Sequence, residues 1–449
     1  MRYQRLPYMY DTLPFSPTDP EYSWQNTALC QYVEEKFRDV CRRFGYREIR
    51  TPILEQTELF TRNIGKGTDI VSKEMFSFQD RGERDISLKP EGTASVVRAC
   101  IQNSLFADYP MLKLYYIGQN FRAERGQKGR YRQHQQLGVE AFGIADAQVD
   151  AEVIALAVNF YRELGITDCE LKINSVGIPE SRQAYGEALR EYVRPYLSEM
   201  SEDGQKRFEM NPLRMLDTKA KGDLEILENA PRLIDYLDPE SADHFEKLQA
   251  YLSALGIAYT LDHKLVRGFD YYTKTAFEIV GRHLGSQSAL GGGGRYDGLV
   301  KECGGANTPG IGFGLGMERC LITLQEMGIT PALPQGASQV FMITLGDEPE
   351  LLRRSLQILM ELRALGIAVD RDFRSKKFPP QVKTADSFKA QYALILGENE
   401  LAQNVIQIRN QATKEQREVA LEGLGKELKG LLGLAPPLAE ELCPRGDAD

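Results

Sequence analysis

The stretch from Phe121 to Glu140 restricts the possible folds more than any other part of the chain. The segments beside it, 112–118 and 137–142, alternate between apolar and polar residues and carry aromatic side chains. This pattern is typical of two antiparallel strands joined by a long loop. Five cations and a single acid lie between these two segments. A loop of that polarity can simply be the solvated tip of a hairpin, because turn residues are usually polar.

The spacing of four polar residues argues for more than a solvated tip. Arg122 and Glu124, two residues apart, precede the loop. Gln136 and Glu140, four residues apart, follow it. Even separations on a strand place side chains on one face of the sheet. We therefore expect each pair to share a face and to form a polar floor on two otherwise apolar strands.

Composition indicates an ordinary soluble protein. The 449 residues suffice for two to four domains, and 42% are hydrophobic and 27% charged. The net charge of −9 gives no general attraction to nucleic acid, so a polyanion would have to bind local clusters of cations. The seven cysteines and four histidines show no metal-ligand spacing, which predicts no zinc site and a reducing compartment. The N-terminal sequence has no signal or membrane-span pattern, so we expect a cytoplasmic protein.

Periodicity predicts helices and one interrupted strand in the first third of the chain. Apolar residues recur at helical spacing in 22–44 and in 149–164, and a glycine follows each run. Residues 46–54 are predicted to form a strand that Pro52 interrupts. Proline belongs at a sheet edge because it has no N–H to donate. This edge can be a dimer seam or an ordinary monomer edge, and the pattern favours neither.

Two further segments have both a structural and a functional interpretation. In the turn at 88–95, Thr93 suits a helix cap, and Glu91 suits the first helical turn, where the helix dipole favours an acid. Glycine fills 291–294 and every second position of 310–316. A strand without side chains on one face can receive a flat ligand or a second backbone. The pattern does not fit the dinucleotide fingerprint, because the glycines continue along a strand.

Composition shifts divide the chain into several parts. One domain is expected over 1–173 and 257–330, interrupted by a charged, helical insertion over 174–256. Residues 331–337, with their prolines and glycine, are expected to be a linker. Strands and helices alternate through 338–449, which predicts a small α/β domain with parallel strands.

Cations gather in and after one loop of this C-terminal domain. They are Arg371, Arg374, Lys376, Lys377, Lys383 and Lys389. Such a group can be a solvated face or a contact for an RNA backbone, and the sequence pattern leaves both interpretations open.

Five segments, in order, carry a family resemblance. Three are Pro52 after the long helix, 121–140, and 310–319. The other two are Arg-Gly-Phe-Asp-Tyr-Tyr at 267–272 and Gly-Gly-Arg-Tyr-Asp-Gly-Leu at 293–299. Together they resemble the three class motifs and the two histidine-specific motifs of bacterial class II histidyl-tRNA synthetases. The resemblance spans nearly the whole chain.

The resemblance implies a fold and an assembly. The expected fold is an α+β catalytic domain on a mixed, mostly antiparallel sheet, with a helical insertion and a C-terminal α/β anticodon-binding domain. The expected assembly is a homodimer, and no association with a membrane is expected. Such an enzyme activates L-histidine with ATP to histidyl-adenylate and transfers it to the 3′ end of tRNA(His). ATP enters with Mg as a substrate, and neither a protein-only metal site nor a tightly bound cofactor is expected.

Each candidate residue receives a role from the resemblance. Arg122 and Arg267 are expected to be catalytic, because two anions meet at the α-phosphate and rigid guanidinium forks match phosphate. Histidine would be bound by Glu91, Gly92, Thr93, Gln136, Glu140, Tyr271 and Tyr272. ATP would be bound by Arg122, Glu124, Arg130, Tyr131, His134, Gly314, Gly316 and Arg319. The acceptor end of the tRNA would be contacted by Gln127, Arg130 and Arg132.

Three segments depart from the family's pattern. His134 stands where the family usually has phenylalanine, and its smaller ring would stack less well on adenine. Residues 7–11 lack the usual Arg-Gly-Thr, so the way in which the N-terminus closes the site is expected to differ. Residues 410–413 replace a more typical acidic–glycine turn, which concerns anticodon contacts.

Two other functions are compatible with such a scaffold. A catalytically inactive paralogue would bind histidine as a regulatory subunit, but it usually lacks the C-terminal domain and the arginines. This chain has that domain together with Arg122, Arg267 and Arg319. A kinase-type or RNA-binding regulator would need an extra domain that this sequence does not have.

Overall fold

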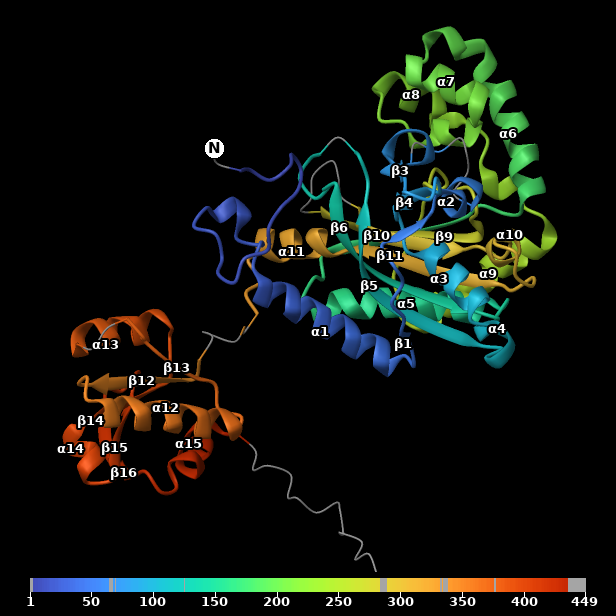
Figure 1. The fold of residues 1–449 in the computed structure, drawn as a ribbon. Coiled ribbons are helices and arrows are strands. Elements are labelled where there is room, and N and C mark those ends of the chain that lie inside the picture. Colours follow the sequence, from blue (N-terminus) through green and yellow to red (C-terminus); the bar gives the residue numbers. More distant parts are fainter. Residues whose placement is uncertain are drawn as a thin grey trace, which may run out of the picture. The chain divides into compact units, whose positions relative to one another are not determined.

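The computed structural model describes residues 3–63, 68, 70–124, 126–282, 289–331, 333, 338–374 and 377–434. Most of the expected linker, Lys376 and the last residues of the C-terminal domain lie outside this part. The chain divides into two units, Met1–Pro331 and Ala332–Asp449 (Figure 1). Among the described residues, no helix has both the length and the apolar character that a membrane crossing requires.

An eight-stranded sheet carries the larger unit. Its order is β1-β5-β6-β11-β10-β9-β7-β8. The edge strands β1 (Arg47–Glu48) and β8 (Thr260–Leu261) pair parallel with β5 (Leu112–Phe121) and β7 (Cys169–Ser175), and all other pairs are antiparallel. The remaining strands are β6 (Gln133–Phe142), β9 (Thr273–Gly281), β10 (Ala289–Arg295) and β11 (Gly310–Gly316). The mixed, mostly antiparallel sheet is therefore confirmed.

The predicted hairpin is formed by β5 and β6, which pair antiparallel along their whole length. Strand β5 ends at Phe121, so Arg122 and Glu124 lie at the start of the loop and not on the strand, where their spacing had placed them. The pairing nevertheless continues one step further, because the Arg122 N–H donates to the Arg132 carbonyl at 2.8 Å.

The alternating glycines of β11 leave room for side chains of the neighbouring strand β6. A Cβ atom at Gly312 would lie 2.0 Å from Glu140 Oε2, and one at Gly314 would lie 1.9 Å from Gln136 Nε2. Both distances are far below van der Waals contact, so only glycine fits at these two positions. Gln136 and Glu140 therefore share one face of β6, as their spacing predicted.

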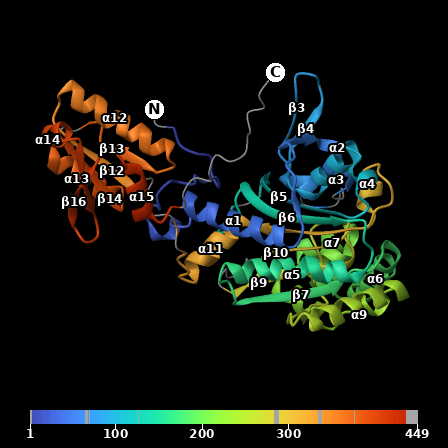
Figure 2. The same cartoon turned by 90° about the horizontal axis from the view of Figure 1, so that it is seen from below.

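Helices cover one face of this sheet (Figures 1 and 2). They are α1 (Thr27–Arg43), α5 (Ala147–Glu163), α9 (Pro239–Ala254) and α11 (Met317–Glu326). Asn26 caps α1, because its Oδ1 accepts from two backbone N–H groups. Phe37 of α1 and Phe160 of α5 meet edge to face at 5.2 Å, and both are fully buried. Burying one such ring stabilises the fold by about 1.5–3 kcal/mol.

The opposite face of the sheet packs against a second hydrophobic cluster. Tyr115 of β5 belongs to the first cluster, whereas its neighbours Leu114 and Tyr116 belong to the second, as the two-residue period of a strand requires. The helices on this side include α3 (Thr93–Gln102), α10 (Leu299–Glu302) and α6 (Pro179–Val193).

The strand expected over 46–54 is split in two. Strand β1 lies at the sheet edge, and β2 (Leu54–Gln56) belongs to a separate three-stranded sheet with β4 (Asp85–Leu88) and β3 (Ser77–Gln79). Pro52 lies between them, where no backbone N–H is needed. Helix α2 (Thr57–Asn63) packs against β2 and β4, whereas α4 (Leu105–Asp108) lies beside α3.

The stretch expected to be an insertion is helical. It contains α6, α7 (Glu202–Met210), the 3-10 helix η4 (Pro212–Asp217) and α8 (Lys221–Ile226), before α9 returns to pack beside α5. Strand β7 extends to Ser175, two residues into the expected insertion. The boundaries at 174 and 256 remain sequence-based proposals.

The smaller unit is a five-stranded sheet in the order β13-β12-β14-β15-β16. The first three strands, β12 (Val340–Leu345), β13 (Val369–Arg371) and β14 (Tyr392–Gly397), are parallel as expected. The last pair, β15 (Val405–Asn410) and β16 (Gln416–Ala420), is antiparallel. The helices are α12 (Pro349–Ala364), α13 (Phe378–Ser387), α14 (Glu398–Ala402) and α15 (Leu424–Leu432).

Candidate active site

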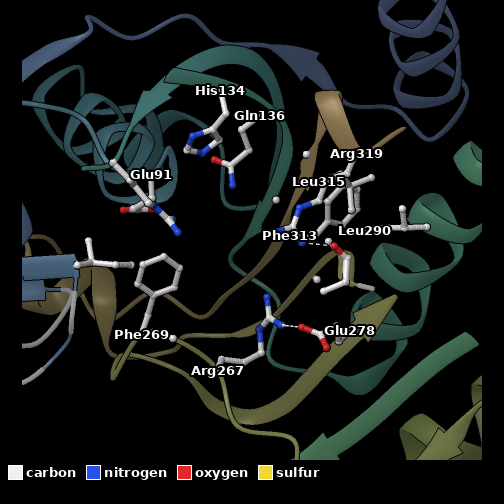
Figure 3. A pocket seen from close by; sticks show the side chains of 18 of the residues that line it. Glu91, His134, Gln136, Arg267, Phe269, Glu278, Leu290, Phe313, Leu315 and Arg319 are labelled. Carbon is white, nitrogen blue, oxygen red and sulfur yellow. Dashed lines mark hydrogen bonds and ion pairs between the residues drawn. The ribbon is translucent and has the colours of Figure 1, made fainter. Parts of the chain in front are cut away.

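A cavity of about 340 Å³ lies beside β6, β10 and β11, between the loops at 122–132 and 266–272 (Figure 3). A cavity of this size suits a small-molecule ligand. It brings together most of the sequence-predicted site residues: Glu91, Thr93, Arg122, Glu124, Arg130, Tyr131, His134, Gln136, Arg267, Tyr271, Tyr272, Gly314, Gly316 and Arg319.

Four sequence-predicted residues are absent from the lining of this cavity. Gly92 is buried, and a Cβ atom there would lie 2.3 Å from the Tyr116 ring. Gln127 is exposed on the loop. The Arg132 guanidinium lies 5.6 Å from the centre of the Tyr8 ring. Glu140 is fully buried behind the cavity wall.

Arg122 is held from two sides in the cavity. Its Nε–H donates to the Pro90 carbonyl at 2.9 Å, and its guanidinium lies 5.8 Å from the centre of the Phe269 ring. Glu124 lies between Arg122 and Arg130, with N···O distances of 3.7 and 3.0 Å. A guanidinium with fixed partners is already oriented before a ligand arrives.

Two more guanidinium groups line the cavity. Arg267 donates from Nη1 to Glu278 of β9 at 2.6 Å (Figure 3). Arg319, in the first turn of α11, donates to the backbone carbonyls of Gly129 and Ala289. Glu278 lines the cavity too, although the sequence analysis did not select it. The only sequence signal for it is its place on the strand that follows the 267–272 motif.

Glu91 caps helix α3, a role that the sequence analysis had given to Thr93. The two carboxylate oxygens of Glu91 accept from the backbone N–H groups of Thr93 and Ala94 at 2.7 and 2.8 Å. Burial raises the pKa of Glu91, and these hydrogen bonds oppose the rise. The Thr93 hydroxyl is thereby free to donate elsewhere, to Glu140 Oε1 at 2.7 Å.

Glu140 is a buried carboxyl surrounded by hydroxyl groups. Besides Thr93, the hydroxyls of Tyr116 and Tyr296 donate to it, the first at 3.4 Å. Burial raises the pKa of Glu140 to about 8, while the hydroxyl donors act in the opposite direction. Tyr296 also lines the cavity. Tyr296 belongs to the 293–299 motif, from which no role was predicted for it.

Two family models match the chain. The model described as "Histidyl-tRNA synthetase" matches residues 21–320, and the one described as "Anticodon binding domain" matches residues 339–431. The chain belongs to the histidyl-tRNA synthetase family. The expected fold, a class II catalytic domain followed by an anticodon-binding domain, is therefore confirmed.

Relatives in the histidyl-tRNA synthetase family match nearly the whole chain. The histidine–tRNA ligase of Desulforamulus reducens is 49% identical over 394 residues, which cover 88% of this chain and 93% of the relative. That of Moorella thermoacetica is 50% identical over 389 residues, which cover 87% and 91%. The crystal structure of apo histidyl-tRNA synthetase from S. aureus has a TM-score of 0.78 and 36% identity, covering 95% of this chain and 100% of that one.

His134, which was expected to depart from the family's usual phenylalanine, has a neutral ring. It is half-buried in the cavity wall (Figure 3). Burial, and to a smaller extent the charges of Arg122 and Arg319, lower the pKa of His134 to about 3. An uncharged planar ring can stack on a base without adding a charge to the site.

The N-terminal segment, which was expected to depart from the family's pattern, packs against the 122–132 loop. The Tyr8 carbonyl accepts from the Arg132 N–H at 3.0 Å, and the Tyr8 ring fills the space next to Gly126. The Tyr10 hydroxyl donates to the buried carboxyl of Glu318, which also accepts from the Gln135 N–H at 2.7 Å. Burial raises the pKa of Glu318 to about 7.

Proposed function

We propose that this chain is a catalytically active histidine–tRNA ligase. It activates L-histidine with ATP, forming histidyl-adenylate and diphosphate, and then transfers the histidyl group to the 3′ end of tRNA(His) with release of AMP. The observation that carries this proposal is the convergence of Arg122 and Arg267 on one cavity with Glu91 and Gln136. This set joins cations for a phosphate with polar groups for an amino acid.

The proposed chemistry needs positive charge more than a nucleophile. The carboxylate of histidine attacks the α-phosphate of ATP, and negative charge grows on the phosphorus oxygens. Arg122 and Arg267 would stabilise that charge, each already oriented by its partners. A preorganised donor of this kind contributes about 3–4 kcal/mol to transition-state stabilisation. The substrate carboxylate is itself the nucleophile, so the reaction requires none from a side chain.

ATP would be bound at the Arg319 end of the cavity. We propose that adenine stacks between Arg319 and His134, with ribose beside Gly314 and Gly316. Tyr131, Glu124 and Arg130 would border the nucleotide. Mg enters with ATP as part of the substrate, and the carboxylates of Glu124 and Glu278 are oxygen donors of the kind that Mg prefers.

Histidine would be bound beside α3. Glu91, Thr93 and Gln136 are proposed to bind its α-amino group, and Tyr271 to line the pocket. Tyr272 and Glu140 are proposed to recognise the imidazole, with Glu140 acting from behind the wall through its hydroxyl partners. A site that pairs both ring nitrogens rejects analogues without them by about 10⁴–10⁵. Gly92 supports this arrangement by its close packing on Tyr116.

The remaining proposals concern macromolecular partners. The loop residues Gln127, Arg130 and Arg132 would contact the acceptor end of tRNA(His), and the smaller unit would bind its anticodon. A homodimer is proposed along the edge of the large sheet, where β1 has an open side and the following Ile53 and Leu54 are exposed. Because the substrates are ATP and tRNA, we propose a cytoplasmic location.

One experiment tests the activity directly. Exchange of radioactive pyrophosphate into ATP would be measured with each of the twenty amino acids, followed by charging of tRNA(His). The proposal expects exchange with histidine alone, and charging of the tRNA. Histidine binding without exchange would instead support the regulatory paralogue.

A further inference from the structure

The loop at 266–272 is a wall between two cavities. Four of its residues, Val266, Arg267, Phe269 and Tyr272, line the candidate active site and also a second cavity of about 390 Å³. The rest of the second cavity is lined largely by the helical insertion, including Arg182, Arg190 and Arg214. The insertion therefore lies directly behind the loop that carries Arg267.

This loop has little structure of its own. Residues 262–272 form neither helix nor strand, so their backbone carbonyls have no partners in regular secondary structure. Two carbonyls after Arg267, those of Gly268 and Tyr272, accept hydrogen bonds from arginine side chains of the insertion. They lie on the C-terminal side of Arg267, one residue and five residues after it.

Two arginines of the insertion provide these bonds. Arg182 of α6 donates from Nη1 to the Tyr272 carbonyl at 2.5 Å. Arg214 of η4 donates from Nη2 to the Gly268 carbonyl at 2.9 Å and to the Asp270 carboxylate at 3.1 Å. The Arg214 side chain is only 19% exposed, so water has limited access to compete for its hydrogen bonds.

The position of the loop affects both proposed catalytic guanidinium groups. Arg267 belongs to the loop, and Phe269 of the same loop lies under the Arg122 guanidinium at 5.8 Å. Phe269 also stacks on Tyr271, with ring centres 5.1 Å apart. A shift of the loop would therefore move Arg267 and the support of Arg122 together.

We propose that Arg182 and Arg214 are positioning residues for amino-acid activation. By holding the carbonyls of Tyr272 and Gly268, they fix the Arg267 loop in the geometry that the α-phosphate requires. The helical insertion thus contributes to a step that involves no RNA. This inference rests on the proposed function, because the two arginines would support the loop that carries the proposed catalytic Arg267.

The test compares two substitutions in the same module. Arg214→Met removes the bonds to the loop. Arg190→Met is the matched control, because Arg190 lines the same cavity but, among the described residues, donates only within the insertion, to the Phe208 and Glu209 carbonyls at 3.1 and 3.5 Å. Histidine-dependent pyrophosphate exchange is measured without tRNA, with thermal unfolding on the same samples.

The proposal expects kcat of exchange to fall about tenfold in Arg214→Met, because small misplacements of catalytic groups cost that much or more. The KM values for ATP and histidine should change much less, and Arg190→Met should match the parent. Asp270→Asn removes the charge of the ion pair without changing its shape, and it should lower kcat in the same direction.

Three results have distinct meanings. Equal exchange by Arg214→Met and Arg190→Met would overturn the positioning role. A fall in kcat that follows the unfolding temperature in both variants would also overturn it, since that marks general loss of structure. No histidine-dependent exchange by the parent would overturn the proposed function itself, and this inference with it.

Discussion

Single residues at this site act through the partners that hold them. Arg267 is paired with Glu278 and borders the cavity from a loop, so its removal should affect chemistry before stability. Arg267→Ala is expected to lower adenylate formation at least about 100-fold, which is the cost of losing one preorganised donor. Single-turnover adenylate formation and thermal unfolding, measured on the same sample, check this. Activity within tenfold of the parent would exclude a catalytic role.

Glu140 gives a second residue-scale prediction, which concerns pH. The folded protein holds the proton of this carboxyl up to about pH 8, whereas its ordinary pKa is 4.5. The stability that Glu140 contributes is therefore complete below its ordinary pKa and is lost as pH rises through about 8. In between, the free energy of unfolding should fall by up to about 1.4 kcal/mol per pH unit relative to Glu140→Gln.

Denaturant unfolding of both proteins over this pH range measures the difference. Glu140→Gln is a suitable reference because the amide has the size of the protonated acid and cannot titrate. Parallel stability curves would show that Glu140 is ionised in the folded state across this range.

Residues of the candidate site could be predicted from the sequence where they belong to a recognisable motif. Arg122, Arg267 and Arg319 reach the cavity because each lies at the end of, or beside, an element with a clear pattern. The burial of Glu140 was not predictable, because it depends on Thr93 and Tyr296, which are 47 and 156 residues away in sequence. The same holds for the pairing of Glu278 with Arg267, since no local pattern says which acid faces a loop cation.

At the scale of elements, the glycine strand β11 gives the sharpest steric prediction. A Cβ atom at Gly312 would lie 2.0 Å from Glu140 Oε2 and 2.3 Å from the Val139 carbonyl oxygen. Gly312→Ala should therefore displace Glu140 and β6 and destabilise the protein by about 1–3 kcal/mol or more, as overpacking does. Weaker histidine binding should accompany this loss.

Gly298→Ala is the control for this prediction. Gly298 precedes α10 with φ of −85°, and a Cβ atom there would meet nothing closer than 3.5 Å. Its unfolding free energy should stay close to that of the parent. If chemical denaturation gave equal values for the two variants, the close packing of β11 on β6 would be refuted.

Elements with strong periodicity were predicted well, and short exposed ones were not. The helices expected at 22–44 and 149–164 correspond to α1 and α5. The sheet of β2, β3 and β4 was not predicted. Its strands have three or four residues and are largely exposed. Such strands carry no alternation, because neither face is consistently buried. Their pairing is set by contacts that are distant in sequence.

At the scale of the whole molecule, the residues proposed for histidine activation and those proposed for RNA contact lie in different units. All residues that line the candidate active site lie in Met1–Pro331, and each of the two units has hydrophobic clusters of its own. In the smaller unit, Arg374 pairs with Asp372, and this pairing lowers the pKa of Asp372 to about 2. Arg371 and Lys383 belong to the same cation-rich region, which is proposed to contact RNA.

A chain that ends after Pro331 is therefore expected to keep histidine activation and to lose most tRNA charging. Its affinity for tRNA(His) should also depend less on salt, because fewer phosphates would be neutralised. Pyrophosphate exchange, charging, and tRNA binding at several salt concentrations are measured on full-length and truncated protein with the same oligomeric state. Unchanged charging by the truncated chain would show that the smaller unit is not the anticodon reader. Loss of both activities would show instead that the smaller unit supports the catalytic one, because the residues proposed for activation would still be present.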